Sequence, residues 1–192
     1  MSEPRRLTDM EIVDILQAGG CVLIMRHTSA SPSAGAHASD SDNTGVEPRL
    51  DEQGRAAATA IGKSLKSLRI PITEVFCSPR SRAQETVRVA GLPTAVISLQ
   101  LDEVPHGEGP AALGWLRTRV KEPPLAGGNV LIVTHMPNII GDFGDELSRV
   151  EPGEVLVFSP DGSTHPNLLA RIRPPRWQSL AGVAPSFMGP EL

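Results

Sequence analysis

The chain has 192 residues and a net charge of −4. Its length suits one domain with a substantial core, and 40% hydrophobic with 21% charged residues excludes a mainly disordered or fibrous protein. The acidic balance provides no overall field that would attract nucleic acid or an anionic membrane, so any anion site must be local.

The cysteines and the N-terminal segment bear on the cellular compartment. Cys21 and Cys77 lie in apolar segments typical of strands, where a thiol acts as a small hydrophobe, so we expect no disulfide framework. No continuous apolar stretch has the length of a signal peptide core or a membrane span. We therefore expect a cytoplasmic protein, with a leader removed from the sequence as the open alternative.

The first half of the chain alternates between helical and strand patterns. LTDMEIVDILQAGG has Thr8 three residues before Glu11, the capping-box spacing, and ends in a glycine pair, which predicts a short helix. The apolar run CVLIM predicts a strand covered on both faces. Residues 28–48 are polar and aperiodic, which predicts a long loop, and LDEQGRAAATAIGKSLKSLRI predicts a helix with its acidic start at Asp51.

The second half continues the alternation. EVFCS predicts a strand, SRAQETVRVAG a helix closed by Gly91, TAVISL a strand and PAALGWLRTRVKE a helix. NVLIVTH is the clearest strand, and Pro137 suits the first turn of a helix that runs to Leu147. EVLVFS and NLLARIR predict a hairpin, and the proline-rich remainder is predicted to be irregular.

Strands that alternate with helices predict an α/β fold. We expect a three-layer sandwich, in which helices flank a mostly parallel central sheet. The chain has no internal repeat and no dividing linker, so we predict a single domain over residues 1–175 and an irregular tail over residues 176–192. Ligands of such sheets bind beyond the carboxyl ends of the strands.

Cationic side chains follow three of the predicted strands. Arg26 and His27 come after VLIM, and His135 comes after VLIVT. Arg80 and Arg82 follow EVFCS. Each of these residues taken singly is ordinary, but the carboxyl ends of parallel strands share one edge of the sheet, so the repetition favours an anion site. A phosphoryl group fits best, because a guanidinium pairs bidentately with phosphate oxygens and stays charged.

Five segments, in order, carry a family resemblance between about residue 22 and residue 144. LIMRHTSAS contains Arg-His, CSPRSRAQETV contains Ser-Pro-x-x-Arg-Ala-x-x-Thr, and VLIVTHMPNI ends a strand in histidine. RLDEQGRAAATAIG and LDEVPHG supply a helix start and an acidic segment. Together they resemble the motifs of the histidine phosphatase superfamily, also called the phosphoglycerate mutase-like family. The resemblance implies that family's fold and, for a short chain, its phosphatase branch.

The resemblance implies a role for each matching residue. His27 matches the nucleophile, whose neutral imidazole attacks phosphorus and forms a phosphohistidine. Arg26, Arg82 and His135 match the residues that surround the phosphoryl oxygens, so neither a metal nor another cofactor is expected. Glu103 matches the proton donor to the leaving oxygen, a role that calls for burial or negative neighbours.

The acidic segment leaves alternatives open. Asp102 and Glu108 flank Glu103 and could share or take its role. A solvated acidic loop with no part in catalysis is the other interpretation.

Two departures from the family pattern follow the two histidines. Thr28 stands where the motif has glycine, so either close backbone approach to phosphate is impaired or the threonine hydroxyl donates to the substrate. Met136 and Pro137 replace small polar residues, and Asn138 is still expected to reach the pocket. We include Thr28 and Asn138 among the predicted substrate-binding residues.

Three further substrate contacts are predicted. Asn43 and Arg49 lie in the long loop that would cover the site, and Arg80 lies beside the predicted phosphate contacts. The alternative for the loop residues is a plain solvated loop.

These observations predict a metal-independent phosphatase that acts on a phosphomonoester or a phosphorylated protein side chain. Its expected partner is a phosphorylated small molecule or phosphoprotein substrate, with no nucleic acid and no membrane. The alternatives are a phosphomutase of the same family, which usually needs larger insertions to exclude water, and a phosphate-binding regulatory module without catalysis. The sequence identifies neither the substrate nor the oligomeric state.

Overall fold

A mixed six-stranded sheet forms the centre of the protein, with strand order β5-β4-β6-β1-β7-β8. The computed structural model describes residues 7–31, 47–103, 114–124, 127–163 and 165–183. The strands of the sheet are β1 (Val22–Arg26), β4 (Ile72–Cys77), β5 (Val96–Ile97), β6 (Asn129–Thr134), β7 (Val155–Ser159) and β8 (Asn167–Ile172). The first four run parallel, whereas β7 is antiparallel to both β1 and β8. The predicted mostly parallel sheet and C-terminal hairpin are confirmed.

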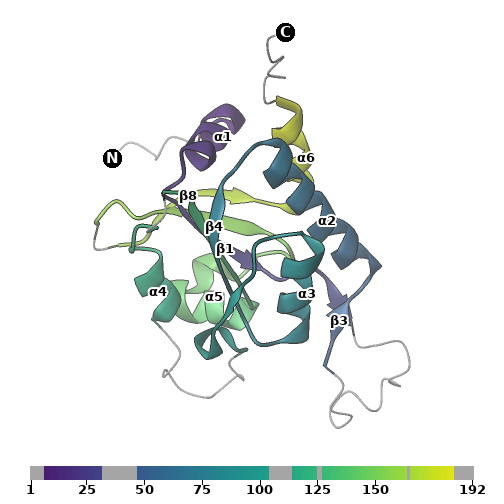
Figure 1. Ribbon diagram of the computed structural model, residues 1–192. Coiled ribbons are helices and arrows are strands. Elements are labelled where there is room, and N and C mark those ends of the chain that lie inside the picture. The colour runs from purple at the N-terminus through teal and green to yellow at the C-terminus, as the bar shows by residue number, and fades with distance from the viewer. Residues whose placement is uncertain (1–6, 32–46, 104–113, 125–126, 164, 184–192) are drawn as a thin grey trace.

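Helices cover both faces of this sheet (Figure 1). One face carries α1 (Asp9–Ala18), α2 (Glu52–Ser67), α3 (Ser81–Val89) and α6 (Pro174–Val183), and the other carries α4 (Trp115–Arg119) and α5 (Met136–Phe143). The 3₁₀ turns are η1 (Leu99–Leu101) and η3 (Asp145–Leu147), and β2 (Ala30–Ser31) pairs with β3 (Arg49–Leu50) outside the main sheet. The predicted three-layer α/β sandwich is therefore the observed fold.

The central strands supply both hydrophobic cores. In β1, Leu23 and Met25 pack into the core beneath α1, α2, α3 and α6. Val22 and Ile24 enter the core on the side of α4 and α5. This alternation explains why the strand is continuously apolar, since both of its faces are buried.

Local contacts fix where α1 and α2 begin. The predicted capping box of Thr8 and Glu11 is present at the start of α1. Asp51 caps α2 by accepting a hydrogen bond from the amide of Gly54 (2.7 Å). A Cβ atom at Gly54 would overlap the backbone carbonyl oxygen of Ser29, so only glycine lets α2 begin this close to the segment that follows β1.

The C-terminal segment differs from the prediction. Residues 176–183 were expected to be irregular, but they belong to α6. Trp177 and Leu180 are three residues apart, a spacing that puts both on one face of a helix, and both are fully buried in the core beneath α2. Burial of these two side chains stabilises the helix. The proline pair at its start led to the prediction of an irregular segment. The rest of the predicted tail, residues 184–192, lies outside the described residues.

Smaller differences concern element lengths. The predicted strand TAVISL contains only Val96–Ile97 as a strand, at the exposed edge of the sheet. The helix expected to reach Leu147 ends at Phe143, because Gly144 follows with a φ of 82°.

Cys21 and Cys77 are buried free thiols, as predicted. None of the described helices is both long and apolar enough to cross a membrane.

Candidate active site

The predicted convergence of three strand ends is present. Arg26 is the last residue of β1 and pairs in register with Thr134 of β6, which brings His27 and His135 side by side. The centroids of the two imidazole rings are 5.2 Å apart. Arg82 reaches the same point from the first turn of α3, which follows β4. The site lies beyond the carboxyl ends of parallel strands, where this class of sheet places its ligands.

Two hydrogen bonds fix the tautomer of His27. Its Nδ1 atom lies 2.8 Å from the carbonyl oxygen of Thr28, which can only accept. Its Nε2 atom lies 3.1 Å from Nε of Arg82, which can only donate. The proton of the neutral ring is therefore on Nδ1, and the Nε2 lone pair points toward Arg82.

His27 is also held neutral. Burial lowers its pKa to about 4, and the charges of Arg82 and Arg26 act in the same direction. The hydrogen bond to the Thr28 carbonyl and the charge of Glu103 oppose this shift. A neutral ring with a free Nε2 lone pair is the form in which an imidazole acts as a nucleophile.

His135 is oriented by Ser78. Its Nε2 atom lies 2.7 Å from Oγ of Ser78, and that oxygen also accepts a hydrogen bond from the amide of Arg80. We assign the Ser78 proton to the bond with His135, which leaves Nδ1 of His135 as an N–H group. This Nδ1 is buried and has no partner among the described residues. Burial lowers the pKa of His135 to about 2, and the nearby His27 and arginines contribute to the shift.

Arg26 supplies a second donor without a partner. Its NH1 group donates to the carbonyl oxygen of Val150 (2.8 Å), which anchors one side of the guanidinium. Its Nε is buried and unpartnered within the described part of the chain. A buried donor without an acceptor is costly, so both Arg26 and His135 favour an anion in their vicinity.

Glu103 lies within reach of the site, in surroundings that differ from those expected. One of its carboxylate oxygens accepts a hydrogen bond from NH2 of Arg82. Its side chain is 41% exposed. The burial that the sequence hypothesis offered is thus replaced by partial exposure and a cationic partner, while Asp102, whose Oδ1 accepts from the Glu103 amide (2.8 Å), is a negative neighbour. Glu108, the alternative acid, lies outside the described residues.

The other predicted substrate contacts divide into two groups. Arg80 pairs with Asp102 at 2.5 Å, and Asn138 donates from Nδ2 to the Asp102 carbonyl at 2.8 Å. Both therefore border the site, and Oδ1 of Asn138 is buried without a partner in the described part of the structure. Arg49 is exposed on β3, at the edge of the long loop. Asn43 lies outside the described residues.

Sequence comparison identifies the family. The profile of the histidine phosphatase superfamily (branch 1) matches residues 22–108, which include His27, Arg82 and Glu103. Residues 22–108 match the histidine phosphatase superfamily (branch 1), as the sequence motifs predict. No curated protein sequence gives a significant match to the chain.

Solved structures of other proteins share the fold. SixA from Nakamurella multipartitia, provisionally assigned as a phosphohistidine phosphatase, is 23% identical with a TM-score of 0.56, over 81% of this chain and 96% of that chain. The protein histidine phosphatase SixA complexed with tungstate is 20% identical with a TM-score of 0.54, over 81% and 98% of the two chains. Rv3214 from Mycobacterium tuberculosis is 22% identical with a TM-score of 0.52, over 79% and 96%.

Thr28, which replaces the glycine of the superfamily motif, points its side chain into the protein interior. Its side chain is fully buried, and its hydroxyl lies 3.2 Å from Oγ1 of Thr86 on α3. The hydroxyl already has a partner in the protein interior, and its donation to a substrate stays a prediction.

Sequence reasoning also missed two residues of the site. Ser78 orients His135, and Thr86 bonds to both the amide and the hydroxyl of Thr28. Both occur in the Ser-Pro-x-x-Arg-Ala-x-x-Thr segment, so the motif itself carried the signal. No cluster of three or more histidine, cysteine or acidic side chains suited to a metal is found in the part of the chain that the structure describes.

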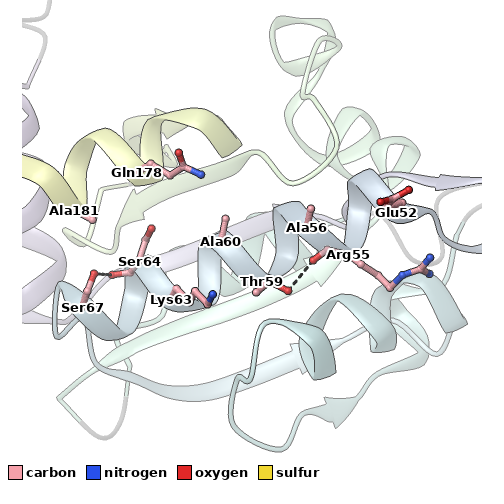
Figure 2. Close-up of a pocket in the computed structure, with 10 residues that line it drawn as sticks. All are labelled: Glu52, Arg55, Ala56, Thr59, Ala60, Lys63, Ser64, Ser67, Gln178 and Ala181. Carbon is pink, nitrogen blue, oxygen red and sulfur yellow. Dashed lines mark hydrogen bonds between the residues drawn. The ribbon is translucent and has the colours of Figure 1, made fainter.

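A groove lies along α2 and α6 (Figure 2). Its lining includes Thr59, Ser64 and Gln178, and none of its residues belongs to the group around His27. The hydroxyl of Thr59 donates to the carbonyl oxygen of Arg55 within α2 (2.9 Å).

Proposed function

We propose that this chain is a metal-independent phosphatase that hydrolyses a phosphomonoester or a phosphorylated protein side chain through a phosphohistidine at His27. The observation that carries the proposal is the state of His27. Its Nδ1 proton is held by the Thr28 carbonyl, so Nε2 keeps its lone pair within a group of cationic and N–H donors. The match to the histidine phosphatase superfamily supports the same reaction class.

The charges and donors around His27 suit a phosphoryl group. Arg80 and Arg82 pair with Asp102 and Glu103, whereas Arg26 makes no ion pair with any described residue. Both histidines are neutral, so the three arginines and two carboxylates together carry a net charge of one positive unit. The unpartnered N–H groups of Arg26 and His135 would donate to the phosphoryl oxygens, and preorganised donors of this kind stabilise charge in the transition state.

The first half of the reaction forms the phosphoenzyme. Arg82 donates to the lone pair that must attack, so an incoming phosphoryl oxygen has to take over this N–H as acceptor. Nε2 of His27 then attacks phosphorus, the P–N bond forms and the ester P–O bond breaks. Glu103 in its protonated form donates to the leaving oxygen, and its exposed position allows it to acquire that proton from solvent.

The second half regenerates the enzyme. Water attacks phosphorus, Glu103 accepts the proton that the water loses, and the P–N bond breaks. Phosphate leaves and His27 returns to the neutral Nδ1–H form. Splitting one displacement into two in this way lowers the barrier of each step.

Groups beside the phosphoryl site are proposed to contact the rest of the substrate. Arg80 and Asn138 meet at Asp102, on the border of the site. Arg49 is exposed beside the long loop, and Asn43 within that loop is proposed as a further contact.

The proposal is tested by hydrolysis of p-nitrophenyl phosphate in metal-free buffer containing a chelator, with vanadate as inhibitor. Wild type should turn over and be inhibited by vanadate, His27→Ala should be inactive, and His165→Ala on the exposed β7–β8 loop should match wild type. Dependence on a bisphosphate primer would indicate a mutase instead. Vanadate binding without turnover on any phosphoester would indicate a regulatory module.

A further inference from the structure

Thr28 forms a hydrogen-bonded connection between the end of β1 and α3. Its amide and its hydroxyl each lie 3.2 Å from Oγ1 of Thr86. The Thr86 hydroxyl in turn lies 2.8 Å from the carbonyl oxygen of Arg82, to which it donates. Because the Thr86 proton is used in that bond, the hydroxyl of Thr28 is the donor toward Thr86. The connection therefore runs from Thr28 through Thr86 to the backbone of Arg82.

The same residue also holds the ring of His27. The Thr28 carbonyl oxygen accepts the Nδ1 proton, and the opposite ring atom, Nε2, accepts from Arg82. Thr28 thus contacts both sides of the His27–Arg82 pair: the imidazole through its carbonyl, and the Arg82 backbone through Thr86. A shift of Thr28 would change the distance between these two groups.

Packing keeps the Thr28 side chain in place. A Cβ atom added to Gly153 would lie 3.2 Å from the Thr28 methyl group and 3.0 Å from Cγ of Pro174, so the methyl group fills the space beside this glycine. The amide of Gly153 donates to the carbonyl oxygens of Arg26 and His27, which fixes the turn against the end of β1.

The backbone does not require glycine at position 28. Arg69 is the one non-glycine residue with a positive φ in the described ranges, so Thr28 adopts a conformation that is ordinary for a residue with a side chain. Replacement of the motif's glycine therefore adds a hydroxyl bond and a methyl contact without backbone strain.

We propose that Thr28 is a positioning residue, whose hydroxyl bond to Thr86 sets the His27 imidazole and the Arg82 guanidinium in register for phosphoryl transfer. This inference rests on the proposed function, since it assigns Thr28 a part in that reaction. It interprets the departure from the superfamily glycine as a gain in preorganisation rather than a loss of activity.

Thr28→Val tests the hydroxyl, because valine keeps the shape of threonine. We expect kcat to fall about tenfold, since displacement of reacting groups by about 1 Å costs up to 10²-fold in rate. KM should change by less than about twofold, because the unpartnered donors of Arg26 and His135 remain to bind phosphate. Thr28→Ser, which keeps the hydroxyl, should retain most of the wild-type kcat.

Two comparisons separate positioning from a general loss of stability. Thr59→Val removes a hydroxyl bond within α2 (Figure 2), at a residue that does not belong to the group around His27, and should leave kcat unchanged. Thr86→Val removes the other end of the connection. If the two threonines act as a unit, the Thr28→Val/Thr86→Val double variant should have nearly the same kcat as Thr86→Val alone.

Nitrogen NMR of the His27 ring provides a readout that does not depend on activity. Wild type should show the Nδ1–H tautomer with Nε2 hydrogen-bonded to Arg82, and Thr28→Val should shift the Nε2 resonance, because the distance to Arg82 changes, while retaining its fold. A wild-type Nε2 resonance and wild-type kcat in Thr28→Val would overturn the inference, as would an equal loss of kcat in Thr28→Ser. If wild type itself forms no phosphoenzyme, the proposed function fails, and the comparison of Nε2 resonances still decides whether Thr28 positions His27.

Discussion

Acidification from about pH 7 to about pH 5 should lower the free energy of unfolding by about 2–4 kcal/mol, because folding keeps two histidines neutral. Burial lowers the pKa of His27 to about 4 and that of His135 to about 2, whereas an unfolded histidine titrates near about 6.5. Over this range the unfolded chain therefore binds protons that the native protein does not. The contribution of the two histidines to the free energy of unfolding is fully present above the pKa that they have in the unfolded chain. It is lost as the pH falls toward the pKa that they have in the folded protein.

The magnitude follows from linkage. By pH 5, a histidine whose pKa is lowered from about 6.5 to about 4 or below has lowered the free energy of unfolding by about 2 kcal/mol. Two such groups would contribute about 4 kcal/mol if they were independent. At pH 5 both rings of the native protein stay neutral, so the two losses add and the expected loss lies near the upper end of the stated range.

Urea denaturation followed by circular dichroism at pH 7, 6 and 5 measures this loss. His27→Gln should remove about half of the pH dependence, since one of the two titrating groups is gone. His165→Gln changes an exposed histidine and should retain the full dependence. A free energy of unfolding that is constant within about 0.5 kcal/mol between pH 7 and pH 5 would refute the assignment of neutral, buried histidines.

Two substitutions test other parts of the structure. Arg82→Lys should lower kcat by a factor of about 10²–10³ in steady-state assays, because lysine cannot present two fixed donors. Arg88→Lys, on the exposed face of the same helix, is the control and should remain within about twofold of wild type. Equal kcat values in the two variants would contradict the role of Arg82. Gly54→Ala should reduce the free energy of unfolding by about 1–3 kcal/mol, because the new Cβ overlaps the Ser29 carbonyl oxygen. Gly182→Ala has open space around it and is the matched control; thermal melts that shift equally in both would contradict the close approach at Gly54.

The position of the site could be predicted from the sequence because it depends on topology. Arg26, His27 and His135 each follow a strongly apolar strand, and the ends of neighbouring parallel strands must meet. The motif residues of α3 added Arg82 to the same place. These signals are local along the chain, so they can be read without knowledge of packing.

The chemical state of the site could not be predicted in this way. The tautomer of His27 depends on Arg82, which is 55 residues away in the sequence, and the direction of the Thr28 side chain depends on Thr86 and Gly153. Such contacts are set by how α3 and the turn at Gly153 pack against the end of β1. A motif shows which residues are present but not which donor meets which acceptor.

The two misjudged elements have tertiary causes. α6 begins with a proline pair that resembles a chain break, and its stability comes from the burial of Trp177 and Leu180 against the rest of the core. The strand predicted over TAVISL is limited to Val96–Ile97 of β5, which lies at the edge of the sheet with β4 as its one neighbour there. Neither cause is visible in a local window of sequence.

Trapping of the phosphoenzyme tests the central claim most directly. The protein is mixed with p-nitrophenyl phosphate, quenched rapidly under alkaline conditions and analysed by mass spectrometry of its peptides. The account predicts one added phosphoryl group on His27, labile to acid and absent from His27→Ala. Turnover by wild type with no phosphoryl group on His27, or with the group on another residue, would contradict it.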